Sequence, residues 1–120
     1  DTAHNRIAAA GPIQPSSEAL THGAIYAVAP DITYVFHTHC PAIWQHARAL
    51  GIELTAADVP YGTPEMASEV QRLLAVSDVR RRGAFAMGGH EDGVISFGPS
   101  IEAAGCAMVS LLARALELTD

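Results

Sequence analysis

The chain has 120 residues, of which 49% are hydrophobic and 17% charged, and this composition is typical of one compact globular domain. The net charge of −6 argues against nucleic acid or an anionic membrane surface as the main partner. All seven basic residues are arginine, which excludes Schiff-base aldolases, pyridoxal-phosphate enzymes and Walker-type phosphate loops, because each of these needs a lysine amine.

The patterns of apolar residues and cysteines indicate a cytoplasmic protein. The sequence shows no signal peptide and no apolar run of about eighteen residues. Cys40 and Cys106 lie far apart in apolar surroundings, so we expect two reduced, buried thiols. The three arginines at 80–82 are expected on a solvated turn after a helix, with an anion-binding patch as the less favoured alternative. Because the chain begins at Asp1 without an initiator methionine, we expect it to be part of something longer.

The apolar periodicity and the turn residues predict alternating helices and strands. In chain order, the predicted elements are a loop or edge segment over residues 1–14, a helix over about 16–29, a strand over 33–39, a helix over 41–50, an extended piece over 52–59, a helix from 64 to at least 74, a strand over 84–87, a tight loop over 88–93, a strand over 94–97 and a helix over about 101–118.

Capping residues mark where these helices start. A serine N-cap with Glu18 in the first turn predicts the first helix start, and Thr63 followed by Pro64 predicts another. Ser100 is expected to cap the last helix. The interspersed elements predict a single-domain α/β fold, in which helices flank a small mixed or antiparallel sheet.

Two histidines in the strand over 33–39 are the first sign of chemistry. Alternate side chains of a strand point to the same face, so His37 and His39 are expected to stand side by side. His90, in a glycine-flanked loop, is the next candidate. Three histidines with an open position form the pattern of a catalytic zinc site. From spacing alone, two unrelated structural histidines in a strand explain the pattern equally well.

The helix before this strand carries candidates for acid–base chemistry and anion binding. Glu18 is the carboxylate best placed to act near the histidines, because consecutive elements usually pack as neighbours. Its alternative role is to compensate the helix dipole. Ser16 and Ser17 suggest an anion site at the helix start, with plain capping as the alternative.

The remaining polar candidates are weaker. His22, one helical turn after Glu18, is either a supporting partner or an ordinary helix-face histidine. His46 is expected to be structural, and His4 carries little weight. Tyr61 is either a phenolic proton donor or, by preference, a surface tyrosine. Beside His90, two acidic residues at 91–92 either orient the imidazole or are solvated loop charges.

Taken together, these residues resemble the class II aldolase/adducin family. The resemblance rests on the segment 15–18, on His37-Thr38-His39, and on His90 followed by Gly93-Val94-Ile95, and it extends from about residue 11 to 118. The family includes fuculose-phosphate and rhamnulose-phosphate aldolases, ribulose-phosphate 4-epimerase and methylthioribulose-phosphate dehydratase. The resemblance implies a three-layer α/β/α domain over residues 1–120 that lacks the family's N-terminal portion.

The resemblance also implies roles for individual residues, assigned here position by position. His37, His39 and His90 would bind Zn²⁺, and Glu18 would take the place of the acid/base carboxylate. The serines at 16–17 would hold a substrate phosphate. Family members are commonly homotetramers with active sites between subunits, which implies a homo-oligomer here.

The sequence departs from the family pattern in three places. Glu91 and Asp92 separate His90 from Gly93, whereas the family usually has glycine directly after this histidine. The family's upstream glycine-asparagine-serine and threonine-proline-serine-glycine phosphate loops have no match. The tyrosine proton donor of some aldolases has no secure counterpart, since Tyr61 is displaced from its position.

We therefore expect a zinc-dependent lyase or epimerase that acts on a small hydroxy-carbonyl compound, a sugar phosphate by preference, through a metal-stabilised enediolate. One alternative is a non-enzymatic, adducin-like interaction module. Another is a metal-binding protein that is catalytically idle. Histidine ligands also suit iron, cobalt, nickel or copper.

Overall fold

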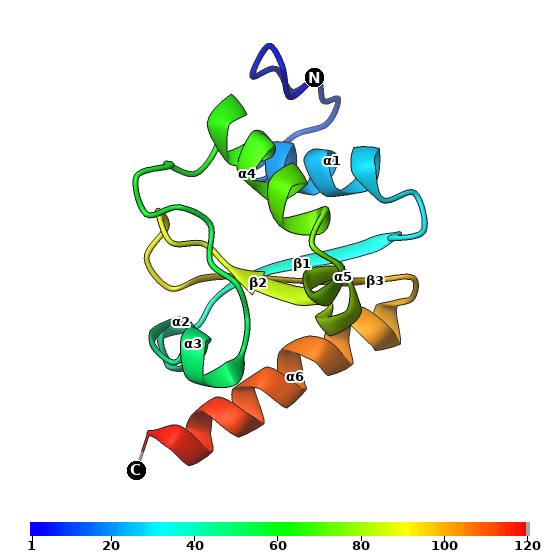
Figure 1. Ribbon diagram of the computed structural model, residues 1–120. Coiled ribbons are helices and arrows are strands. Elements are labelled where there is room, and N and C mark those ends of the chain that lie inside the picture. The colour runs from blue at the N-terminus through cyan, green and yellow to red at the C-terminus, as the bar shows by residue number, and fades with distance from the viewer. Residues whose placement is uncertain (120) are drawn as a thin grey trace.

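A three-stranded antiparallel sheet lies at the centre of the computed structural model, which describes residues 1–119 (Figure 1). Helices α1 and α4 cover one face of the sheet, and α6 covers the other. The strands are β1 (Tyr34–His39), β2 (Ala84–Ala86) and β3 (Gly93–Gly98). The helices are α1 (Ala19–Val28), α2 (Pro41–Gln45), α3 (Ala47–Leu50), α4 (Pro64–Leu74), α5 (Ser77–Arg82) and α6 (Ile101–Leu118). The expected three-layer α/β/α fold is confirmed.

The central strand, β3, sets the register of the sheet. It pairs antiparallel with β1 on one side and with β2 on the other. His37 lies opposite Ile95, and His39 lies opposite Gly93. The β2–β3 hairpin is confirmed, and its connecting loop lies next to the last residue of β1 because of this register.

Each face of the sheet has its own apolar core. On the α1/α4 face, Ile95 and Phe97 belong to the same buried cluster as Ile25 of α1. On the α6 face, Val94 packs in a second buried cluster with Leu111. Since side chains alternate along a strand, the two histidines of β1 lie on the α1/α4 face. No helix among the described residues is both long and apolar enough to cross a membrane.

Two of the predicted helix starts are confirmed in detail. The Thr63 hydroxyl accepts a hydrogen bond from the Met66 N–H at 3.2 Å, and Pro64 is the first residue of α4. The Ser100 hydroxyl caps α6 in the same way, through the N–H of Ala103 at 3.1 Å.

The predicted serine cap of the first helix is wrong. Glu18 is the N-cap residue of α1, and no side chain caps this helix. The Ser16 hydroxyl instead accepts the Glu18 N–H at 3.2 Å, one step before the helix begins. A turn that forms ahead of α1 therefore uses the hydroxyl that we expected at the cap.

The predicted helix over 41–50 is divided into α2 and α3. His46 interrupts it with a non-helical backbone conformation, and its ring Nδ1 lies 2.9 Å from the Ala42 carbonyl oxygen. The expected stop is confirmed, because Gly51 adopts the left-handed conformation that ends α3.

The arginines at 80–82 do not lie in a loop after a helix, as predicted. They form the last helical turn of α5 itself. Cations are favourable at this end of a helix. Arg80 also pairs with Asp31 at 2.7 Å.

Both cysteines are free, as expected, but only Cys40 is partly buried, whereas Cys106 is exposed on α6. The expected buried position of Cys106 is wrong because its side of α6 faces away from the sheet.

The segment between α3 and α4 is held to the rest of the fold by a partly buried carboxylate, that of Glu69. Glu69 accepts the backbone N–H of Ala56 at 2.8 Å and forms two hydrogen bonds with Arg72, at 2.8 and 2.9 Å. The Arg72 guanidinium, and then the Ala56 N–H, lower the pKa of Glu69 to about 2. This segment also contacts the sheet, through the Thr55 N–H and the Ala86 carbonyl oxygen at 3.0 Å.

We expect Glu69→Ala to lower the free energy of unfolding by about 1–3 kcal/mol at pH 7, because the Ala56 N–H loses a charged acceptor. The folded-state pKa of Glu69 is depressed, so the ionised carboxylate stabilises the fold fully above the unfolded pKa of about 4.5. This contribution disappears as the pH falls toward 2. Urea unfolding of the wild type and the variant at pH 7, 4 and 2.5 measures the difference.

Glu65→Ala is the matched control, since Glu65 is an exposed carboxylate on the same helix. A difference between wild type and Glu69→Ala that stays constant from pH 7 to 2.5 would contradict the assignment.

Candidate metal centre

Three imidazoles from two parts of the chain meet at one end of the sheet. His37 and His39 project from β1, and His90 comes from the β2–β3 loop. One nitrogen from each ring lies within 4.8 Å of the nitrogens of the other two. The ring centroids of His39 and His90 are 4.6 Å apart, and those of His37 and His39 are 5.1 Å apart. The structure therefore brings together the three histidines that the sequence predicted as ligands.

Backbone hydrogen bonds hold the β2–β3 loop against the end of β1. The N–H of Cys40, directly after His39, donates to the Asp92 carbonyl oxygen at 2.8 Å. Asp92 has a φ of 64°, a left-handed conformation that aspartate tolerates better than most residues. The acidic residues at 91–92 that separate His90 from Gly93 therefore form the turn that joins this loop to β1.

The glycines of this loop allow close contacts. A Cβ atom on Gly93 would lie 3.2 Å from the ring Cγ of His90 and 3.2 Å from the Met87 sulfur. A Cβ atom on Gly89 would overlap the Val59 carbonyl oxygen. Glycine is needed at position 89, where the loop packs against the segment before α4. At position 93 a side chain would require the His90 ring or the Met87 side chain to shift.

A buried carboxylate completes the cluster. Glu18, 6% exposed, places Oε1 3.5 Å from Nδ1 of His90. Among the described residues, three buried side-chain atoms have no hydrogen-bond partner: Glu18 Oε1, His37 Nδ1 and His90 Nδ1. Buried polar atoms without a partner are rare, and they call for an ion, a water or a ligand. All three of these atoms belong to this cluster.

The cluster fits a divalent transition metal. Around a tetrahedral ion with bonds of about 2.1 Å, ligand nitrogens lie about 3.4 Å apart, so shifts of about 1 Å would bring these imidazoles onto one ion. Three histidine ligands leave a fourth position open, as in catalytic sites. The unpartnered nitrogens of His37 and His90 are consistent with such an ion.

Thr21 fixes the orientation of the Glu18 carboxylate. Its hydroxyl, in a side chain that is only 1% exposed, donates to Glu18 Oε2 at 3.2 Å. The other oxygen, Oε1, is the one that faces His90. Thr21 was not among the residues predicted for the site, although a polar residue between Leu20 and Ala24 on the buried side of α1 is a signal that it has a buried partner.

Burial lowers the pKa of two histidines near Glu18, His37 and His22. Burial lowers the pKa of His37; the Glu18 carboxylate raises it, and the imidazoles of His90 and His39 lower it further. Burial likewise lowers the pKa of His22, against the opposing effect of Glu18. Neutral imidazole is the form that binds a metal ion, so burial favours the binding form at His37.

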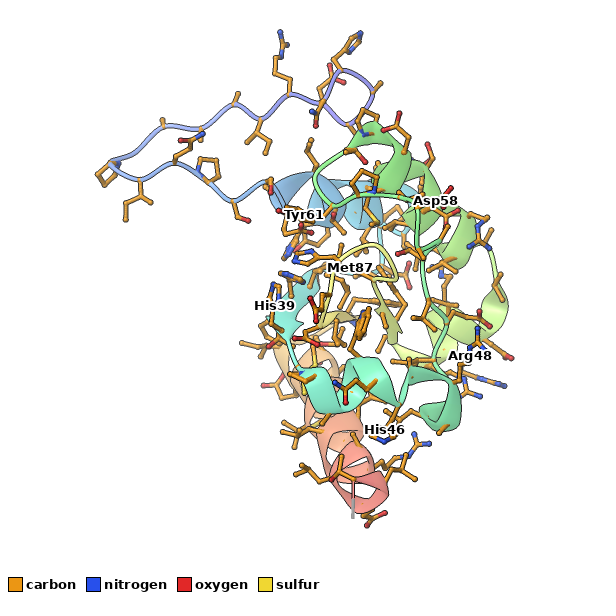
Figure 2. All side chains as sticks on the ribbon, turned by 90° about the vertical axis from the view of Figure 1, so that its left-hand side faces the viewer. His39, His46, Arg48, Asp58, Tyr61 and Met87 are labelled. Carbon is orange, nitrogen blue, oxygen red and sulfur yellow. The ribbon has the colours of Figure 1, made fainter. Side chains whose placement is uncertain are left out.

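Tyr61 contacts one member of the cluster, His90. Its ring centroid lies 4.2 Å from that of His90, although half of the residue is exposed. In Figure 2, His39 lies at the left of the body of the molecule, with Tyr61 above it and Met87 nearer the middle of the view. The preferred interpretation of Tyr61 as a plain surface tyrosine therefore missed a contact with a candidate ligand.

A family model, that of the class II aldolase and adducin N-terminal domain, matches residues 1–118. The chain belongs to this family. No curated protein and no solved structure matches it significantly. Class II aldolase/adducin domains include lyases and epimerases as well as non-enzymatic adducins, so membership supports a site of this general kind without naming a substrate.

The other predicted site residues of this class II aldolase/adducin domain are dispersed. The two serines before α1 diverge, because Ser16 lines a groove that also contains Glu18, whereas Ser17 lines a cavity beside the N-terminal segment. His22 is half-buried in the same groove as Glu18. His46 lies away from the cluster, near α3 (Figure 2). His4 is not brought into the site either; it is exposed and pairs with Asp1 at 2.8 Å.

We expect Thr21→Val to lower the free energy of unfolding by about 1–3 kcal/mol, because it leaves a buried Glu18 oxygen without its donor at nearly constant side-chain volume. In a Glu18→Ala background the same substitution should have no cost. A double-mutant cycle from urea unfolding measures the coupling. Equal effects of Thr21→Val in the two backgrounds would contradict a positioning role for Thr21.

Proposed function

We propose that this domain is a metal-dependent lyase or epimerase that acts on a small hydroxy-carbonyl compound, in particular a sugar phosphate. The observation that carries the proposal is the buried, unpartnered Oε1 of Glu18, 3.5 Å from His90 in a cluster of three histidines. An unpartnered buried carboxylate oxygen costs stability. Catalysis is a reason to keep it there.

In this proposal His37, His39 and His90 hold Zn²⁺ or another divalent transition metal. The ion supplies a Lewis acid that stabilises negative charge on neighbouring substrate oxygens. Glu18 moves a proton to or from the carbon next to the carbonyl group. Its burial excludes water, and the hydrogen bond from Thr21 keeps Oε1 directed toward the histidines.

The two serines before α1 are proposed to contact a substrate phosphate, and Ser16 is the better placed. It lines the groove that also contains Glu18 and His37, whereas Ser17 does not. The groove residues include no arginine in the described part of the chain, so a hydroxyl is the type of donor that this end offers.

We also propose that the protein is a homo-oligomer, a tetramer by analogy with its family. Exposed apolar side chains on the outer side of α6 support this proposal, namely Val109, Leu112 and Leu116. Buried apolar area is the main source of stability in such interfaces.

The wild-type protein is expected to bind one Zn²⁺ per chain. Zinc should raise its melting temperature above that of the zinc-free protein, and a chelator should reverse this rise. Replacement of His37, His39 or His90 by alanine should weaken zinc binding by at least about 100-fold, since even partners of the ligands contribute 10–100-fold. His46→Ala is the matched control and should bind zinc normally. Competition titration with a chromophoric chelator measures the affinity, and unchanged binding in any of the three variants would contradict its role as a ligand.

Glu18→Gln is expected to keep zinc bound and to abolish proton transfer. We would follow hydrogen–deuterium exchange at the hydroxymethyl carbon of dihydroxyacetone phosphate in D₂O by proton NMR. The zinc-loaded wild type should exchange this proton, and Glu18→Gln should be slower by at least about 100-fold because it has no carboxylate base.

The same exchange experiment separates the proposed enzyme from its alternatives. His46→Gln is a control that should keep the wild-type rate. Unchanged exchange in Glu18→Gln would overturn the role of Glu18. A zinc-loaded wild type that neither exchanges this proton nor cleaves any member of a panel of sugar phosphates would be an idle metal-binding domain.

A further inference from the structure

An open groove of about 620 Å³ extends from the candidate site along α1 and β1. Glu18 and His37 line it where it meets the histidine cluster. From there, Ala19, Gly23 and Tyr26 line it along one side of α1, at the spacing that places residues on a single helix face. The rise from residue 19 to 26 of a helix is about 10 Å, so the groove has room for a substituent well beyond the reacting atoms.

Gly23 has no structural reason to be glycine. It lies inside α1, where glycine is unfavourable compared with alanine, and its φ is not in the left-handed region. A Cβ atom built on it would meet no atom within 4 Å. Gly89 of the β2–β3 loop, by contrast, is required by a close contact. The absence of a side chain at Gly23 keeps the groove open.

The chemistry of the groove favours an apolar or aromatic occupant. Four polar residues line it, namely Ser16, Glu18, His22 and His37, and its other lining residues are Ala19, Gly23, Tyr26, Val35 and Phe36. No arginine lines it within the described residues, and the chain has no lysine. A second anionic group on the substrate would therefore find no cation there, and next to Ala19 and Gly23 a sugar hydroxyl would find no side-chain partner.

We propose that this groove is a binding subsite for an apolar or aromatic substituent of the substrate, kept open by Gly23. The inference rests on the proposed function, since it places the reacting hydroxy-carbonyl group at Glu18 and the histidines. It names the substrate class as a hydroxy-carbonyl compound with an alkyl or aryl group on the side away from the metal centre. The unpartnered oxygen of Glu18, which is more than nine-tenths buried, indicates that a ligand occupies the inner end of the groove.

The test compares two metal-chelating probes that differ only in their substituent. Acetohydroxamate has the chelating group alone, and phenylacetohydroxamate adds an aromatic ring. Isothermal titration of the zinc-loaded wild type should show that phenylacetohydroxamate binds at least about tenfold more tightly, because the ring is buried in the groove. Turnover is not needed for this measurement.

Gly23→Leu fills the groove and is expected to remove this gain, so that the two probes bind within about twofold of each other. Its zinc affinity and its affinity for acetohydroxamate should match the wild type, and its melting temperature should be no lower. Gly105→Ala is the matched control, because Gly105 is also a helical glycine with space for a Cβ atom but lies on α6, outside the groove. This control should keep the tenfold gain.

The outcomes separate the subsite from the proposed function. A wild type that binds both probes equally would overturn the subsite and leave the metal centre intact. Zinc-loaded protein that binds neither probe would contradict the proposed function and the subsite together. If Gly23→Leu dissociates an oligomer in sedimentation velocity while the two probes bind the wild type equally, the groove is a contact between subunits, and the subsite is overturned.

Discussion

The candidate site depends on the backbone hydrogen bonds that join the end of β1 to the β2–β3 loop. The Cys40 N–H bonds to the Asp92 carbonyl oxygen, and His39 lies opposite Gly93 in the sheet. These contacts involve no imidazole, so the sheet itself brings His90 to the two histidines of β1. The histidines are thereby held close together by the fold without any attraction between their side chains.

Local signals in the sequence were sufficient for most of the fold. A capping hydroxyl at Thr63 or Ser100 acts within one helical turn, so sequence spacing alone reveals it. The division of the helix over 41–50 at His46 was not predicted, because it depends on a hydrogen bond of the ring to the Ala42 carbonyl oxygen. The predicted serine cap of α1 was wrong for a similar reason, because the Ser16 hydroxyl accepts the Glu18 N–H within a turn that precedes the helix.

The histidine cluster was predictable and its surroundings were not. The period of a strand places His37 beside His39, the glycine-flanked loop and the preceding helix made His90 and Glu18 candidates, and the family resemblance then implied a role for each. The contact between Tyr61 and His90 joins residues far apart in sequence, and nothing in the turn around Tyr61 indicates it. The sequence pattern shows which residue types are present, whereas tertiary packing determines which of them lie against the site.

The place of β1 in the sheet gives the histidine cluster a second consequence. Within the described residues, β1 pairs only with β3 and so forms an edge of the sheet. Exposed edge strands present unpaired backbone groups to other chains and favour aggregation. An ion held jointly by His37, His39 and His90 would act as a cross-link between this edge and the β2–β3 hairpin. A bound metal ion would then also reduce aggregation through the exposed edge of β1. The metal-free chain would be the form that self-associates through this strand.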